Sequence, residues 1–296
     1  MKKGFLTTLG LTFIMQLILV YPLQAKHYYF KQISVKEGLP SNVRCILRDG
    51  QGFVWIGTKA GLGKFDGHEL KRYTHKANDP NSLPHNLIHQ IAEDKQHNIW
   101  VLTEKGIARY QRERNNFTFP TDEDGNYITA YSFCSVPEGI LFGGKDRIYM
   151  YRYEDDSFKL LQYFNAKSFK ITALCPWDSQ TLLCCSRWMG LLLVDLQTGK
   201  YRRPPFDCGL EIMSMIADTQ KRIWVAPYNG GLHCFSPDGK PLSTYTTTNS
   251  SLSNNIVVSL AEREGQLWIG TDGGGINILD PETGKISQLE HIPGRE

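Results

Sequence analysis

Short apolar runs separated by polar turn residues recur along most of the chain. In the clearest stretch an apolar run ends at Asp49, a Gly-containing turn follows, and the next run reads Trp-Ile-Gly-Thr from Trp55 to Thr58. Successive residues of such a run point to opposite faces, as they do in a β-strand. A further loop, a third run at 62–65 and a fourth at 70–74 complete the unit. Four short strands in a unit of about 42 residues make a β-propeller blade.

The unit occurs six times. The position of Trp55 recurs at 100, 141, 183, 224 and 268, so consecutive copies are 45, 41, 42, 41 and 44 residues apart. A Gly-Leu or Gly-Ile step also recurs at nearly the same offset. The copies around 141, 183 and 224 are degenerate, and Leu141 and Leu183 stand where the clear copies have Trp. This regularity predicts an all-β fold, a β-propeller with six blades present.

Two residue types mark the blades. We expect a flat ring at one position per blade to fill the gap between adjacent sheets; these residues are Trp55, Trp100, Trp224 and Trp268. We expect the carboxylates of Asp49 and Asp94 to start tight turns by accepting hydrogen bonds from backbone N–H groups.

One additional strand is predicted before the first copy, at 28–33. The Leu-Pro and Asn residues that follow it at 39–42 resemble those at 83–86, which follow the fourth strand of a unit. The last copy has a fourth strand of its own at 285–291, so a closed six-blade ring would leave one strand over. We favour a seven-blade ring whose remaining three strands lie beyond Glu296, which makes the chain the N-terminal part of a longer protein. The ring in this chain would then be open or strained, because unpaired edges are a liability.

The first 25 residues have the pattern of a secretory signal peptide. Lys2 and Lys3 precede an apolar run from Phe5 to Tyr21, and Ala25 offers a small residue for cleavage. The alternative is an uncleaved membrane anchor, but the run is near the short end for a bilayer span. We therefore assign residues 26–296 to an exported propeller domain.

Composition excludes several classes of protein. The chain has 296 residues and 41% hydrophobic content, enough for a substantial core. Lys2 and Lys3 account for two of its three net positive charges, so the exported part is nearly neutral and has no electrostatic footprint for nucleic acid. The seven cysteines form no CxxC pair, and the eight histidines show no repeated pattern of metal ligands. We predict no metal, no cofactor and small buried thiols.

The repeat resembles a known family. Gly38-Leu-Pro-Ser-Asn42, Asp49 and Gly52, Trp55-Ile-Gly-Thr58 and Gly61-Leu62 are similar to the two-component regulator propeller repeat, over about residues 28–291. The degenerate third and fourth copies depart from it, since Leu replaces Trp and Cys184-Cys185 replaces Ile-Gly.

The resemblance implies the periplasmic sensor region of a hybrid two-component histidine kinase of Bacteroides-type bacteria. Such proteins carry two propellers, an immunoglobulin-like connector, one membrane helix and a kinase core, they dimerise, and they commonly sense glycan fragments. The kinase and membrane parts are not in this sequence, so any kinase activity and any membrane contact would reside in a C-terminal part.

Candidate ligand contacts lie in the loops between the second and third strands and in the links between blades. Aromatic rings stack on sugar faces, and polar or charged groups bind hydroxyls or carboxylates. The candidates are Trp188, Tyr228, Arg187, Asn229, Lys59 and Asp272. The alternative for each is an ordinary solvated turn.

Two other functions remain open at this point. A retaining glycosidase needs two carboxylates about 5 Å apart, whereas the loop carboxylates Glu104, Asp146 and Asp272 come from different blades. A protein-interaction scaffold would show a broad, flat apolar patch, whereas a pocket lined by Trp188 and Tyr228 would favour a ligand.

Overall fold

The computed structural model describes residues 33, 36, 38–39, 42–164, 170–186 and 189–289. The predicted signal peptide, nearly all of the predicted strand at 28–33, and the candidate contacts Arg187 and Trp188 lie outside these residues. The described part of the chain folds into β-strands joined by turns and loops. No helix in this part is long and apolar enough to cross a membrane.

The strands form six antiparallel sheets of four, each in chain order. Blade one consists of β1 (Val43–Arg48), β2 (Val54–Thr58), β3 (Gly61–Phe65) and β4 (Leu70–Tyr73). Blade two consists of β5 (Ile88–Glu93), β6 (Ile99–Thr103), β7 (Gly106–Gln111) and β8 (Asn116–Thr118). Blade three consists of β9 (Ser132–Val136), β10 (Gly139–Gly143), β11 (Arg147–Arg152) and β12 (Ser157–Tyr163).

The second half of the ring continues the pattern. Blade four consists of β13 (Ile171–Pro176), β14 (Thr181–Ser186), β15 (Gly190–Asp195) and β16 (Tyr201–Arg202). Blade five consists of β17 (Ile212–Ala217), β18 (Ile223–Pro227), β19 (Leu232–Phe235) and β20 (Pro241–Tyr245). Blade six consists of β21 (Val257–Arg263), β22 (Gln266–Thr271), β23 (Gly275–Leu279) and β24 (Ile286–Gln288).

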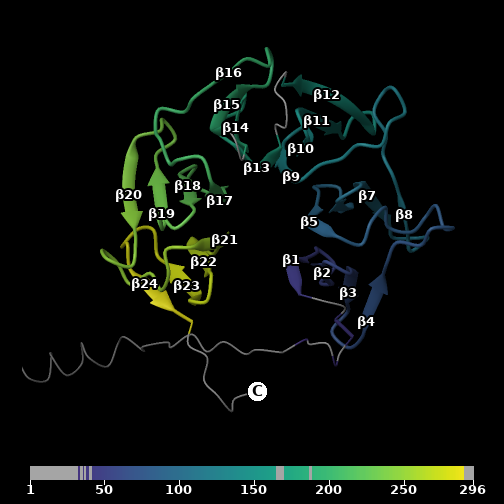
Figure 1. Ribbon diagram of the computed structural model, residues 1–296, viewed down its shortest axis with the longest axis horizontal. Coiled ribbons are helices and arrows are strands. Elements are labelled where there is room, and N and C mark those ends of the chain that lie inside the picture. Colours follow the sequence, from purple (N-terminus) through teal and green to yellow (C-terminus); the bar gives the residue numbers. More distant parts are fainter. Residues whose placement is uncertain are drawn as a thin grey trace, which may run out of the picture. The chain divides into compact units, whose positions relative to one another are not determined.

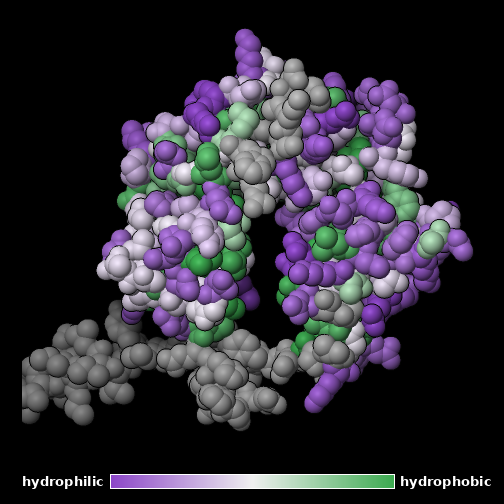
Figure 2. Space-filling model, viewed as in Figure 1, coloured by the Kyte–Doolittle hydropathy of each residue, from purple (hydrophilic) through white to green (hydrophobic). Residues whose placement is uncertain are grey.

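The six blades stand around a central axis (Figure 1). The first strand of each blade is innermost, and the fourth lies at the rim. The sequence prediction of an all-β propeller with six four-stranded blades is therefore confirmed. Figure 2 shows that the ring is hollow at its centre; we call this space the central channel.

In the described residues the core consists of five separate apolar layers, each between two successive blades. Trp55 packs with Ile88 and Ile99 of the next blade, and Trp100 packs likewise with Phe142. Trp55, Trp100 and Trp224 are at most 1% exposed. Burial of such a side chain stabilises by roughly 1.5–3 kcal/mol relative to exposure, so these rings bind neighbouring sheets together.

The Asp residues hold the turn between the first and second strands. The Asp49 carboxylate accepts hydrogen bonds from the Gln51 and Phe53 amides and, at 2.9 Å, from the indole N–H of Trp55. Asp94 and Asp218 bind Trp100 and Trp224 at the same distance. One carboxylate thus fixes both the turn and the ring that packs between the blades.

The thiols have the buried environment that the sequence suggested. All seven cysteines are free, and five of them are buried. Burial raises the pKa of the Cys175 thiol to about 12 and that of Cys234 to about 11. These side chains therefore act as small apolar groups, because a thiol with so high a pKa forms little thiolate at neutral pH.

In the described part of the chain, the ring is open between blades six and one (Figure 1). Successive inner strands pack against one another from β1 through β21, but no comparable packing joins β21 to β1 in the described residues. Val43 and Ile46 of β1 are 43% and 65% exposed, whereas Ile88 and Ile91, at the same positions of blade two, are almost fully buried against blade one. Hydrophobic residues are visible on both sides of the gap in Figure 2.

Candidate ligand-binding site

The alternation of strand directions places the predicted contact loops at one end of the ring. In an antiparallel sheet of four strands, the turn between the second and third strands lies at the same end as the link to the next blade. Backbone hydrogen bonds join these turns to the links that enter the blades. The amides of Glu104, Tyr228 and Asp272 donate to the carbonyl groups of Leu87, Glu211 and Ile256, respectively. We call this end the loop face.

Local sequence explains the tight turns of the loop face. In blade one the Thr58 hydroxyl accepts a hydrogen bond from the Ala60 amide and donates to the Gly61 carbonyl. Gly61 has φ of 125°, and a Cβ atom there would meet the Tyr73 carbonyl oxygen at 2.6 Å. The Gly of the recurring Gly-Leu step is required at this position because only glycine avoids that clash.

The predicted residues that can be described all lie on the loop face. Lys59, Tyr228, Asn229 and Asp272 are exposed, and they come from blades one, five and six. Asn229 has φ of 53°, a turn conformation that Asn tolerates. In the described part of the chain no hydrogen bond or ion pair joins any two of these side chains. Their role as ligand contacts stays a prediction.

A different group of side chains does come together at the loop face. His89 Nε2 lies 2.6 Å from the Glu104 carboxylate, and the His89 ring makes an edge contact with Tyr131 at 5.5 Å between centroids. Lys170 Nζ lies 3.5 Å above the centre of the Tyr131 ring. We call His89, Glu104, Tyr131 and Lys170 the channel cluster, since His89 belongs to an inner strand and the others flank it.

The electrostatics of the channel cluster are set by burial and by nearby cations. Burial lowers the pKa of His89, the charges of Lys170 and Arg44 lower it further, and Glu104 opposes them only in part. The hydrogen bond from His89 lowers the pKa of Glu104. At neutral pH the pair is therefore a neutral imidazole that donates its Nε2–H to a carboxylate.

The sequence contains the components of the channel cluster but no obvious signal of their association. Glu104 stood out only as one of several loop carboxylates. His89 lies in the inner strand β5, and Tyr131 directly precedes the inner strand β9. Lys170 lies in the link into blade four. Only the packing of blades two, three and four brings them together.

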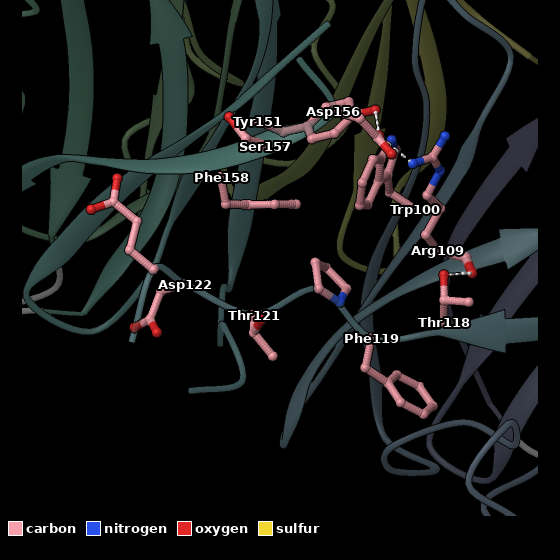
Figure 3. Close-up of a pocket in the computed structure, with 12 residues that line it drawn as sticks. Trp100, Arg109, Thr118, Phe119, Thr121, Asp122, Tyr151, Asp156, Ser157 and Phe158 are labelled. Atoms are coloured by element: carbon pink, nitrogen blue, oxygen red, sulfur yellow. Dashed lines mark hydrogen bonds and ion pairs between the residues drawn. The ribbon is translucent and has the colours of Figure 1, made fainter. Parts of the chain in front are cut away.

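A second hollow, of about 430 Å³, lies between the outer strands of blades two and three (Figure 3). Three of its aromatic residues, Trp100, Tyr151 and Phe158, are buried and pack against one another. Figure 3 shows Arg109 and Asp156 facing each other beside Trp100, and their ion pair measures 2.6 Å. Because these groups already satisfy one another, we assign this hollow to blade packing.

No metal centre is evident in the described ranges, where no group of three or more His, Cys, Asp or Glu side chains could hold an ion. The predicted site residues also offer no ligand set of this kind.

Comparison with known families decides what the repeat is. Residues 37–60, 82–105 and 251–273 match the two component regulator propeller family. Each stretch includes the inner strand and the second strand of a blade, in blades one, two and six. Three stretches of this chain, in blades one, two and six, therefore match repeats of the two-component regulator propeller family. The resemblance suggested by the sequence is thereby confirmed for these three blades, and blades three to five have the same four-stranded fold but lie outside the matched stretches.

Two solved structures with similar folds are extracellular domains of regulatory systems. The extracellular domain of a hybrid two component system from B. thetaiotaomicron matches with a TM-score of 0.72 and 21% identity, covering 91% of this chain and 38% of that one. The extracellular domain of a one component system from the same organism matches with a TM-score of 0.70 and 19% identity, covering 89% and 38%. At such identities the likeness shows a shared fold.

A curated relative adds a local match. Histidine kinase P4 of Formosa agariphila is 39% identical over 61 residues, which are 20% of this chain and 4% of the kinase. This propeller-repeat chain thus spans less than two fifths of the solved relatives and a small fraction of the kinase.

Proposed function

We propose that this chain is an extracytoplasmic ligand-sensing propeller of a two-component signal-transduction system, and that its ligand is a glycan fragment. The observation that carries the proposal is the family repeat in blades one, two and six. Extracellular domains of regulatory systems share the fold over about nine tenths of this chain. We propose that the chain binds a ligand and transmits the binding event to a signalling part of the protein, and that its own role is non-catalytic.

The loop face supports a glycan as the ligand. Exposed tyrosine, asparagine, aspartate and lysine side chains gather there from several blades, and sugars are bound by such mixtures of rings and polar groups. The location we propose is the periplasm. We also propose that the protein acts as a homodimer and that any kinase activity belongs to a part outside these 296 residues.

Isothermal titration calorimetry of the exported chain against neutral and acidic oligosaccharides tests the proposal. We expect one class of glycan to bind, and we expect the double variant Tyr228→Ala/Asn229→Ala to weaken that binding. Tyr201→Ala is the matched control, because Tyr201 is also exposed but lies on the fourth strand of blade four at the rim. A well-folded chain that binds no glycan would contradict the proposal and favour a protein-interaction scaffold.

A further inference from the structure

The inner strands share a bulge at their second residue. In blades one, two, four, five and six the pairing with the second strand skips this residue, and in blade three Tyr131 takes the same place just before β9. A bulge re-aims the side chain that it carries, and bulges are frequent beside binding sites. The six residues are Arg44, His89, Tyr131, Thr172, Met213 and Val258.

These residues surround the loop-face end of the central channel, which we call the channel mouth. They are exposed or half-buried although they belong to the innermost strands or directly precede them. Their chemistry is divided. Blades one to three contribute the cationic and aromatic residues Arg44, His89 and Tyr131, whereas blades four to six contribute uncharged residues.

The charged half of the channel mouth holds more cations than anions. The Lys170 ammonium lies over the face of the Tyr131 ring, and in the described residues neither Lys170 nor Arg44 forms an ion pair. Lys145 pairs with Lys170 through the backbone, which brings another exposed lysine to the same place. The one carboxylate of the channel cluster, Glu104, is engaged by His89 at 2.6 Å.

Such an arrangement is suited to an anion. The charges of Lys170 and Arg44 both act on His89, and a carboxylate or sulfate bound between the two cations would gain charge-assisted hydrogen bonds. Arg44, Lys145 and Lys170 outnumber the one carboxylate, Glu104, and a recess with an excess of positive charge concentrates anionic ligands. The neutral His89, which donates Nε2–H to Glu104, leaves Nδ1 to accept a hydrogen bond from a hydroxyl group.

We propose that the channel mouth binds an acidic sugar, whose carboxylate or sulfate lies between Arg44 and Lys170. Tyr131 and the uncharged residues across the mouth contact the sugar ring, and His89 accepts a hydrogen bond from one of its hydroxyls. This assignment rests on the proposed glycan-sensing function and names its ligand class.

Calorimetry with three probes tests the assignment: trigalacturonate, its fully methyl-esterified form and a sulfated galactan oligosaccharide. The ester keeps the sugar and removes the charge. We expect an acidic probe to bind about tenfold or more tightly than the ester, because a hydrogen bond to a charged group contributes roughly 1.5–3 kcal/mol. The better of the carboxylate and sulfate probes identifies the anion, and its binding weakens as salt is added.

Variants locate the site. Lys170→Gln and Arg44→Gln should each weaken binding of the acidic probe about tenfold, whereas Lys170→Arg should retain most of it. Lys200→Gln is the control, since Lys200 is exposed in the turn between β15 and β16 on the opposite face. Circular dichroism verifies that each variant is folded, and Lys170→Arg keeps the test valid if a Gln variant is not.

The outcomes separate this inference from the proposed function. If neutral glycans bind as well as acidic ones, the inference fails and glycan sensing stands. If acidic glycans bind but neither Gln variant weakens them, the channel mouth is the wrong place. If no glycan binds, both proposals fail.

Discussion

At the scale of single residues, buried carboxylates connect neighbouring blades. The Asp49 side chain is completely buried, and besides its bonds within blade one it accepts both terminal N–H groups of Arg112 from blade two, at 3.1 and 3.2 Å. The carboxylate therefore belongs to two sheets at once. Its removal leaves several buried donors without an acceptor, which is the costly way to break such a network.

We expect Asp49→Ala to lower the free energy of unfolding by about 3 kcal/mol. Urea denaturation followed by tryptophan fluorescence measures the change. Asp66→Ala is the control, because Asp66 also accepts backbone hydrogen bonds in a turn but is exposed. Equal losses for both variants would show that the link between blades contributes nothing.

The same carboxylate predicts a pH dependence. Burial alone would raise the pKa of Asp49, but the hydrogen bonds from Trp55, Phe53 and Arg112 outweigh it and lower the pKa. A folded-state pKa below the unfolded value of about 3.9 stabilises the fold above that pH, and this contribution is lost as the pH falls through the folded-state pKa. The difference in melting temperature between wild type and Asp49→Ala should therefore be largest near pH 7 and shrink below pH about 4. Scanning calorimetry at several pH values checks this, and a difference that stays constant would contradict it.

At the scale of elements, the strands and turns were predictable because each blade repeats the same local chemistry. Asp at the turn, Trp six residues later and Gly before the third strand are local signals, and they located β2, β3 and β6 almost to the residue. Blade six shows where the rule changes. Its first turn is shortened to Glu264 and Gly265, both at positive φ, so this blade needs no Asp there.

Contacts between elements were less predictable. Glu93, at the end of β5, accepts a hydrogen bond from the Gly50 amide in the turn of blade one at 2.7 Å. The Glu262 carboxylate of blade six likewise accepts two hydrogen bonds from Thr219 of blade five. The Thr219 amide donates at 2.8 Å and the Thr219 hydroxyl at 2.6 Å. The spacing within a repeat gives no sign that a residue serves its neighbour, because the acceptor and the donor lie 43 residues apart.

We expect Glu262→Ala to destabilise the chain by about 1 kcal/mol, since two hydrogen bonds between blades five and six are lost. The exposed Glu113, in the turn between β7 and β8, is the control, and Glu113→Ala should change stability by less than about 0.5 kcal/mol. Thermal unfolding measures both. Identical melting curves for the two variants would exclude a role for this contact.

At the scale of the whole molecule, the sequence pointed to the loop face, which also carries the proposed channel mouth, but it gave no sign of the channel mouth itself. Loop residues such as Tyr228 and Asp272 were visible because they interrupt the strand pattern. Arg44, His89 and Tyr131 lie within or directly before runs that read as ordinary strands, and only the bulges and the ring geometry turn them toward one another. The residues of the channel mouth occur once per blade, so their spacing in the sequence is the same as the spacing of the repeat. That spacing therefore gives no separate signal of a site.

The open ring also belongs to this scale, and it provides a test of the seven-blade proposal. Positions 46 and 91 are equivalent, yet Ile46 is 65% exposed and Ile91 is 5% exposed. In these 296 residues we expect Ile46→Asp to change the melting temperature little, because its side chain has no apolar layer to disrupt. Ile91→Asp should prevent stable folding, because it places an unpaired charge in the layer between blades one and two.

Comparing Ile46→Asp with Ile91→Asp in a chain that extends beyond Glu296 tests the seven-blade ring directly. If further strands complete a seventh blade, its apolar face covers β1 and Ile46→Asp becomes as damaging as Ile91→Asp. Thermal unfolding of both variants in both contexts measures the difference. If Ile46→Asp stays harmless in the longer protein, no blade packs on β1 there and the seven-blade ring is wrong. If Ile46→Asp is already destabilising in the short chain, the gap is closed in solution by packing against another apolar surface.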